Sequence, residues 1–234
     1  MAYLPSHLKY ALSDEEIVHN DDGKEILFKR TKIADLSVNS PEICACDPLV
    51  CPDTPPFTQK VPTGRFPVYL SIAHIRTDRR VGFAALVFSK EPVHRWEMAL
   101  LPKQNISKLK PEEIFGYGVD SGTGCFIDSH SAALLNTRMQ GEDAYYEVIT
   151  DELDKTQVNT WAWANIELSS NPSANFVAFS TGYGDGMYAS YFGFGADKVP
   201  LCLVTDFGLI YEKQTEEEQA DKKPKSNRWM FWKK

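Results

Sequence analysis

The 234-residue chain has little of what usually reveals a function directly. No stretch approaches the roughly 18 consecutive apolar residues that a membrane span needs. The first residues, Met1 to His7, lack the basic and apolar regions of a signal peptide. Five cysteines, an odd number, do not make a disulfide framework, so we expect reduced thiols. These absences predict a cytoplasmic protein without stable membrane association.

Positive charge is also scarce, because 25 Lys and Arg stand against 32 Asp and Glu, for a net charge of −7. Proteins that bind nucleic acid rely on cations to displace phosphate counterions, so no nucleic-acid partner is expected. Residues 213–234 carry seven of the cations and four of the acids, which leaves the first 212 residues with a net charge of −10. This charge favours cations or basic surfaces as partners.

Composition indicates one soluble domain, since 43% of the residues are hydrophobic and 24% are charged. From Lys213 onward the chain is poor in apolar residues and dense in charge, which disfavours ordered structure. We therefore predict a single globular domain over residues 1–212 and a flexible charged tail over 213–234. The tail ends in a basic aromatic tag, Arg228 to Lys234, that could dock on a partner or pack back on its own domain.

Alternating apolar residues predict strands in the middle of the chain. Phe66, Val68, Leu70 and Ile72 fall on one face of an expected strand, and Val81–Phe88 is apolar on both faces. A polar turn at residues 77–80 would join the two as a hairpin. Further short strand candidates, separated by turn residues, are Val93–Leu101, Trp161–Leu168, Asn175–Ser180, Met187–Phe194 and Leu201–Tyr211.

Two helices interrupt the strand pattern. The first is expected from about Ser129 to Met139, with Asp128 or Ser129 as its N-cap. The second, from about Asp143 to Lys155, should lie on the surface of a sheet through an apolar side made of Tyr145, Val148, Ile149 and Leu153. The predicted fold is α+β and mainly β: an antiparallel sandwich or a strongly bent sheet, with two helices inserted near residues 129–155.

Seven of the fourteen prolines lie between Pro41 and Pro67. Proline removes a backbone donor and interrupts strand ladders, so this part is expected to be an ordered but irregular crossing segment.

A glycine-rich stretch from Gly118 to Asp128 carries two acids, Asp120 and Asp128. Gly122 and Gly124 would let the backbone approach a ligand and offer amide donors, while the two carboxylates could hold a divalent cation. A structural interpretation is also available, in which the glycines form a turn, Asp120 caps it and Asp128 caps the helix that follows. The sequence alone leaves both interpretations open.

A second glycine-rich stretch contains Tyr183, Gly184, Asp185, Gly186 and Tyr188. Neither a helix pattern nor Gly-Lys-Ser/Thr follows it, so the dinucleotide and P-loop mechanisms do not apply. Tyrosine hydroxyls and an acid among glycines would suit a polar ligand site, although Asp185-Gly186 is also an ordinary hairpin turn. Asp206, at an expected strand end, could join this acidic group.

Other chemistry is weakly supported. The five histidines are scattered, and only His130 lies near a glycine-rich stretch. Gly118 to Gly122 misses the Gly-x-Ser-x-Gly nucleophile pattern by one place, which disfavours nucleophilic catalysis. Cys44, Cys46 and Cys51 lack a clear fourth ligand for zinc.

Several motifs together resemble an uncharacterised family, domain of unknown function 4241. They are Cys46-Asp47-Pro48, Val61 to Val68, Trp96 to Ala99, Gly118 to Asp128, Gly182 to Gly193 and Thr205-Asp206-Phe207. The resemblance covers about Ile43 to Ile210. The order and spacing of the motifs are more specific than any single motif. It implies one domain over nearly the whole chain and carries no established activity.

Two functional hypotheses follow. The first is a divalent-metal-dependent hydrolase, using Mg²⁺ or Ca²⁺, that acts on a phosphoester or nucleotide-like small molecule. Its catalytic and metal-binding residues would be Asp120, Asp128 and Asp185, with Asp206 as a further ligand; Tyr183, Tyr188, Gly122, Gly124, Gly184 and Gly186 would bind substrate. The alternative is a non-catalytic binding or immunity-type protein whose acidic face engages a basic protein partner.

Overall fold

A computed structural model of the chain describes residues 4–21, 24–110, 113–141, 144–170 and 173–210. Its elements, in chain order, are the 3-10 helix η1 (Ser6–Ala11), β1 (Ile17–Asp21), β2 (Lys24–Val38), β3 (Ile43–Cys46), β4 (Gly64–Ile75), β5 (Asp78–Val87), β6 (Arg95–Met98), the 3-10 helix η2 (Ile106–Lys108), β7 (Tyr117–Val119), β8 (Thr123–Asp128), α1 (Ser129–Gly141), α2 (Ala144–Asp154), β9 (Trp163–Ser170), β10 (Ser173–Ser180), β11 (Gly186–Phe194) and β12 (Pro200–Asp206).

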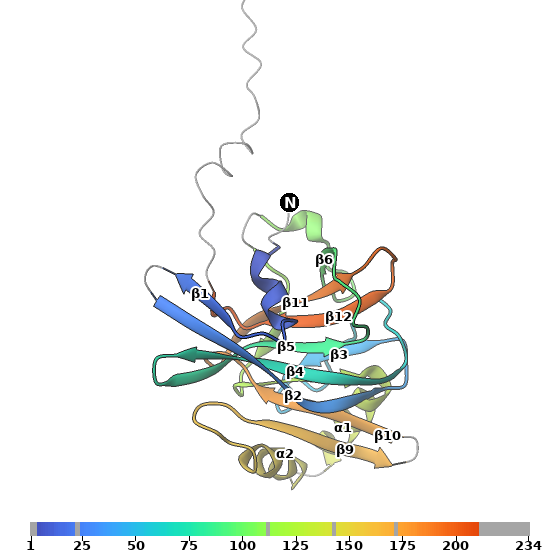
Figure 1. Cartoon of the computed structure of the whole chain (residues 1–234). Helices are drawn as coiled ribbons and strands as arrows, with labels where there is room; N and C mark the ends of the chain where they lie inside the picture. The colour runs from blue at the N-terminus through green and yellow to red at the C-terminus, as the bar shows by residue number, and fades with distance from the viewer. Residues whose placement is uncertain (1–3, 22–23, 111–112, 142–143, 171–172, 211–234) are drawn as a thin grey trace, which may run out of the picture.

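The strands form two antiparallel sheets. The larger sheet has eight strands in the order β1-β2-β4-β5-β12-β11-β6, with β7 paired to β11. It is strongly curled, and the smaller sheet, β3-β8-β10-β9, packs beside it (Figure 1). The prediction of a mainly β, α+β fold with a strongly bent sheet and two inserted helices is therefore confirmed.

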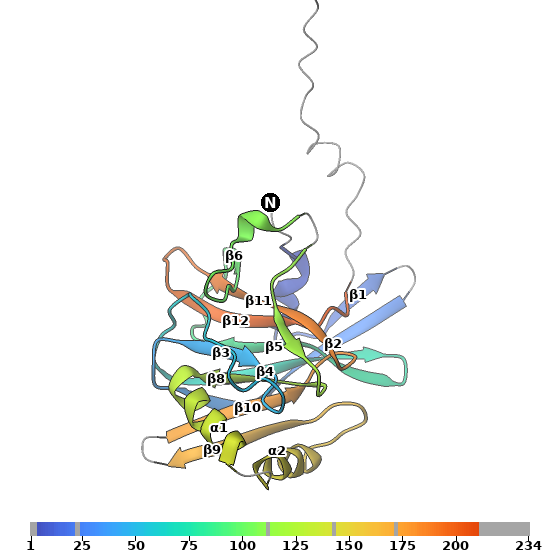
Figure 2. The same ribbon diagram turned by 180° about the vertical axis from the view of Figure 1, so that it is seen from behind.

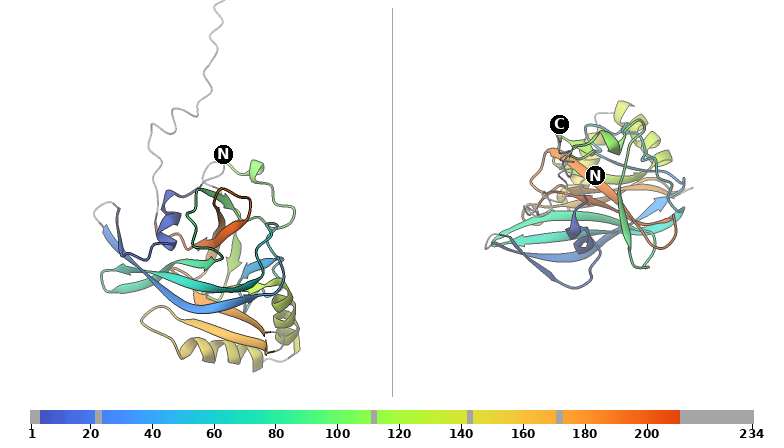
Figure 3. Two further views of the ribbon diagram at one scale, coloured as in Figure 1. Left: turned by 45° about the vertical axis from the view of Figure 1, so that its right-hand side comes forward. Right: turned by 90° about the horizontal axis from the view of Figure 1, so that it is seen from above.

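Successive side chains of a strand point to opposite faces of its sheet, and the buried apolar side chains form three layers. Between the sheets lie side chains such as Leu70, Leu86 and Phe126. The helices α1 and α2 cover the outer face of the smaller sheet, over Ile127 and Phe176 (Figure 2). Helix η1 covers the other face of the larger sheet and lies at the opposite end of the molecule from α2 (Figure 3). That covered face also holds the cavity described below.

Strand β2 is the longest strand, and the alternation pattern failed to predict it because the strand carries a bulge. Its pairing with β4 shifts between Lys32 and Ala34, so Ile33 is an extra residue. Phe28 therefore packs beneath η1, whereas Leu36 packs between the two sheets, although an unbroken strand would place residues an even number of positions apart on the same face. A bulge reverses which face a residue occupies, and this breaks the period of two that identifies a strand in sequence.

Other boundaries differ from the predictions. The hairpin of β4 and β5 turns at residues 76–77, so it shares only Thr77 with the predicted turn at residues 77–80, and Arg76 adopts the left-handed conformation with φ of 56°. The proline-rich crossing segment is irregular except for β3 and the start of β4. In α2, Tyr145 and Ile149 are buried as predicted, but Val148 is 42% exposed.

Two predictions lie largely outside the described part of the chain. The predicted domain boundary at residue 212 and the tail over 213–234 both follow Ile210, the last described residue. Of the helices that are described, none is long and apolar enough to cross a membrane.

Candidate functional site

A buried carboxylate, Asp47, organises the first glycine-rich stretch; the sequence predicted it as part of a family motif but not as a candidate site residue. Asp47 is fully buried and accepts hydrogen bonds from Asp120 N at 3.0 Å, Ser121 N at 2.9 Å and Ser121 Oγ at 2.8 Å. It also accepts the backbone N–H groups of Leu49 and Val50 in its own loop. Asp47 thus ties the β3–β4 loop to the turn between β7 and β8, while the Asp120 side chain is exposed.

Asp128 is also fully buried and fully engaged. Its Oδ2 accepts hydrogen bonds from Ser40 N and Ser40 Oγ, both at 2.7 Å. Its Oδ1 accepts His130 N at 2.9 Å and Ser131 N at 3.3 Å, in the first turn of α1. A carboxylate offers about four acceptor positions, so these four donors leave no position for a metal ion. The helix-capping interpretation of Asp128 is confirmed.

Gly122 and Gly124 serve packing between two turns. Gly122 has φ of +67°, and its carbonyl accepts Thr181 N at 3.1 Å, which brings the β7–β8 turn against the β10–β11 turn. A Cβ on Gly124 would lie 2.8 Å from the Tyr117 hydroxyl oxygen, closer than a real side chain tolerates. Both positions therefore require glycine for structural reasons.

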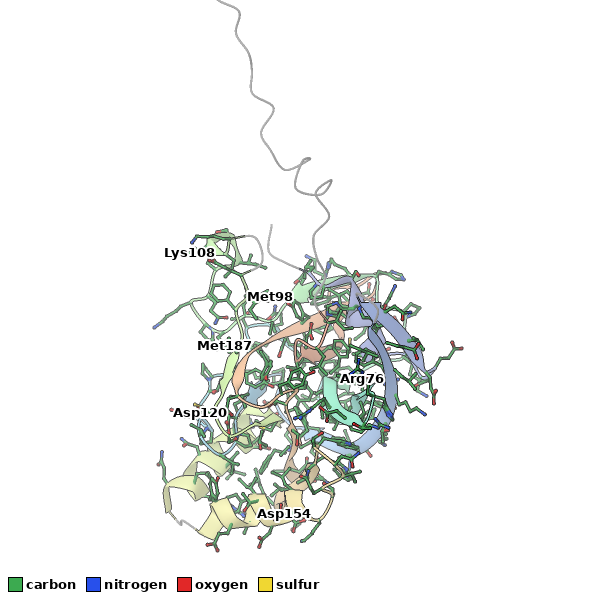
Figure 4. All side chains as sticks on the ribbon, turned by 90° about the vertical axis from the view of Figure 1, so that its left-hand side faces the viewer. Arg76, Met98, Lys108, Asp120, Asp154 and Met187 are labelled. Carbon is green, nitrogen blue, oxygen red and sulfur yellow. The ribbon has the colours of Figure 1, made fainter. Side chains whose placement is uncertain are left out.

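A cavity of about 520 Å³ opens beside the ends of β11 and β12, under η1. It is lined by His7, Ile114, Tyr183, Asp185, Gly186, Met187, Tyr188, Ala189, Tyr191, Asp206, Phe207, Gly208 and Ile210. Sequence reasoning selected five of these residues: Tyr183, Asp185, Gly186, Tyr188 and Asp206. Asp120, Asp128, Gly122, Gly124 and Gly184 do not line it. Figure 4 shows Met187 of the cavity and Asp120 on the same side of the molecule.

Asp206 is the inner acid of this cavity. Its Oδ2 lies 2.8 Å from His7 Nε2, and its Oδ1 accepts Gly208 N at 2.8 Å. The His7 ring is 2% exposed and packs 5.8 Å from the Phe83 ring. Sequence reasoning missed His7, because nothing in its N-terminal context indicates a contact with a residue 199 positions away. These contacts fix the orientation of the Asp206 carboxylate.

The outer part of the cavity is acidic and aromatic. Asp185 is exposed, whereas the Tyr188 ring is held by a hydrogen bond from its hydroxyl to Gly184 O and by edge contact with Phe207 at 5.0 Å. Tyr183 is 64% exposed, with the Arg80 guanidinium 5.2 Å from its ring centroid. Neither lysine nor arginine is among the described residues that line the cavity.

The acids do not assemble into a recognisable metal centre. Within the described ranges, no group of three or more His, Cys, Asp or Glu could hold a metal ion. The structure brings Asp185 and Asp206 to one cavity and leaves Asp120 and Asp128 outside it.

Four of the five cysteines are buried in the core, and Cys51 is exposed. All five are free thiols, and Cys46 Sγ lies 3.5 Å from Cys125 Sγ on the neighbouring strand. The hydrogen bond with Cys125 and burial both raise the pKa of Cys46, so its thiol stays protonated and unreactive.

The fold and this cavity define a β-rich α+β protein with an acidic, tyrosine-lined cavity at one end of a curled sheet. Residues 36–205 match the family model described as "Protein of unknown function (DUF4241)", and the chain belongs to this family. The resemblance drawn from the motifs is thereby confirmed. Comparisons with curated proteins and with solved structures find no match.

Proposed function

We propose that the chain is a non-catalytic binding protein whose acidic cavity takes the ammonium or guanidinium group of a lysine or arginine side chain on a basic partner protein. The main observation behind this proposal is that two carboxylates, Asp185 and Asp206, line a cavity to which the described residues contribute no lysine or arginine. A cation placed between carboxylates and aromatic rings gains both ion pairing and attraction to the ring faces.

The geometry suits such a group. Asp206 is 11% exposed and held in place by His7 and Gly208, so its carboxylate is preorganised. Asp185, by contrast, is exposed and forms no hydrogen bond or ion pair with the rest of the described chain, so an incoming cation need not displace one. The Tyr188 and Phe207 rings meet edge to face at 5.0 Å, and this contact holds both rings in place beside the carboxylates. The volume of about 520 Å³ lies in the range of ordinary ligand sites.

The net charge of the chain also favours a basic partner. Residues 1–212 carry a net charge of −10, so a basic protein would be attracted before contact. Attraction of this kind raises the association rate and weakens as salt screens the charges. Binding should therefore weaken between low and physiological ionic strength.

A matched peptide pair tests the proposal. The probes are an acetylated and amidated Gly-Arg-Gly peptide and the same peptide with neutral citrulline in place of arginine, titrated into the full chain and followed by NMR chemical shifts. We expect the arginine peptide to bind about tenfold more tightly, which corresponds to about 1.4 kcal/mol. Asp185→Asn should remove most of this preference. Asp120→Asn, an exposed acid outside the cavity with the same charge change, is the control and should retain it. Equal binding of the two peptides would contradict the proposal.

The metal-dependent hydrolase is the second candidate, supported by the shared cavity of Asp185, Asp206, Tyr183 and Tyr188. Asp185 and Asp206 would hold Mg²⁺ or Ca²⁺, which supplies an acidified water when bound, and the tyrosines would orient a phosphoester or nucleotide-like substrate. Asp120 and Asp128 lie outside the cavity, so the remaining ligands would be water or substrate. A ligand that binds only the native state raises thermal stability. A melting-temperature increase with metal plus nucleotide, lost in Asp185→Asn and kept in Asp120→Asn, would favour this candidate over the first.

A further inference from the structure

A second cavity, of about 660 Å³, has a different chemical character from the first. It lies between β2, β4 and β12 and the segments that follow η1 and β5. Three cations, Arg30, Arg65 and Lys90, line it together with two acids, Asp14 and Glu91. A cavity in which cations outnumber acids is unexpected in a chain whose net charge is −7.

Arg30 is the buried cation of this cavity. Its side chain is 9% exposed, and its guanidinium carbon lies 3.6 Å from the centroid of the Tyr69 ring. Nη1 donates to Leu12 O at 3.0 Å and to the Asp14 carboxylate. This stacking and pairing fix the plane of the guanidinium.

The same guanidinium retains unused hydrogen-bonding capacity. Arg30 Nε is buried and has no hydrogen-bond partner, and Nη2 forms no hydrogen bond with any described residue. Arginine presents five N–H donors in a planar fork that matches the two oxygens of a carboxylate or phosphate. A buried donor without an acceptor is costly, and an anion oxygen placed against this guanidinium would offset part of that cost.

The other two cations lie at the exposed side of the cavity. Arg65 and Lys90 are exposed, and neither forms an ion pair with a described residue. Asp14, one of the two acids, is already paired with Arg30. Two cations are therefore available at the surface beside the buried one.

An apolar wall completes the cavity. The Phe66 and Phe88 rings meet edge to face at 5.1 Å, and Val87, Val93 and Leu201 line the same space. Cys202 also lines it, but burial raises the pKa of its thiol to about 12, so it is no nucleophile at neutral pH. The cavity thus offers reversible binding to an apolar body next to a cationic group.

We propose that this cavity binds a small organic anion, with a carboxylate or phosphate group held by Arg30, Arg65 and Lys90 and an aromatic or aliphatic body against Phe66 and Phe88. The proposal is independent of the acidic cavity. The two sites differ in the sign of charge they recognise and share no lining residue.

Calorimetric titration of the full chain tests this site with four probes: benzoate, phenyl phosphate, inorganic phosphate and neutral benzyl alcohol. We expect benzoate or phenyl phosphate to bind about tenfold or more tightly than both inorganic phosphate and benzyl alcohol, because only those two combine a charge with an apolar body. The tighter of the two identifies the head group. Binding of inorganic phosphate as tight as that of the aromatic anions, or no binding of either aromatic anion, would overturn the proposal.

Matched double variants locate the binding. Arg65→Gln with Lys90→Gln removes two exposed cations from the cavity and should weaken the aromatic anion about tenfold, without the folding risk of altering buried Arg30. Lys103→Gln with Lys108→Gln removes two exposed cations elsewhere and should change the affinity less than about twofold. Equal weakening by both pairs would indicate nonspecific attraction and would overturn the proposed site.

Discussion

Replacing Asp128 by asparagine separates a structural role from a catalytic one. Asparagine keeps one oxygen, which can still accept His130 N and Ser131 N at the start of α1. Its amide nitrogen would then face Ser40 N and Ser40 Oγ, which now donate to Oδ2 at 2.7 Å. Both hydrogen bonds to a buried charge are lost: Ser40 N is left facing a donor, and Ser40 Oγ, which can also accept, is left with a weaker bond from a neutral amide.

The expected cost follows from these two contacts. Hydrogen bonds to charged groups contribute about 1.5–3 kcal/mol each, so Asp128→Asn should lower the free energy of unfolding by about 3 kcal/mol or more. For a domain of this length, that loss corresponds to a fall of about 6–12 °C in melting temperature. Urea unfolding followed by circular dichroism measures the first quantity, and a thermal scan measures the second.

Asp120→Asn is the matched control for this experiment. Its side chain is exposed, and only its backbone N–H contacts Asp47, so the substitution should change stability by less than about 0.5 kcal/mol. If Asp128→Asn were as stable as the control, the assignment of Asp128 as a cap and a clamp on Ser40 would be refuted.

Three further predictions concern the supports of the fold. Asp47→Asn should destabilise the protein by about 3 kcal/mol or more in urea unfolding, because Asp47 is buried and accepts three hydrogen bonds from residues 120–121; an unchanged midpoint would refute this. Gly124→Ala should cost about 1–3 kcal/mol through contact with the Tyr117 hydroxyl, and a neutral effect in the same assay would show that the site can relax. Burial raises the pKa of Cys202 from 9.0 to about 12, so as the pH rises the unfolded chain loses this proton before the folded chain does. The free energy of unfolding should therefore fall by up to about 1.4 kcal/mol per pH unit between pH 9 and 12. The pH dependence of unfolding should therefore be shallower in Cys202→Ala than in the wild type.

The parts of the fold that sequence predicted are those where a local pattern runs unbroken. Phe66, Val68, Leu70 and Ile72 alternate without interruption, and the structure buries Val68, Leu70 and Ile72 between the sheets with Phe66 packed against them. Strand β2 escaped prediction because the extra residue Ile33 reverses its inward face halfway along. Local pattern therefore fails where a single residue changes the register.

The candidate site shows the same division. Both glycine-rich stretches contain a turn, as their residues indicate, but strand pairing and the position of the N-terminal helix determine which acids lie close together. Asp185 and Asp206 share a cavity because β11 pairs with β12, and His7 joins them only because η1 packs across that sheet. Asp47, which holds the other stretch, lies 73 residues from Asp120. Contacts over such separations leave no local signal.

The most direct measurement of the central claim is the affinity of the arginine peptide relative to the citrulline peptide in three proteins: the wild type, Asp185→Asn and Asp120→Asn. The acidic cavity predicts a preference of about tenfold for arginine in the wild type and in Asp120→Asn, and little preference in Asp185→Asn. An equal preference in all three proteins, or none in the wild type, would contradict the assignment of this cavity as the binding site.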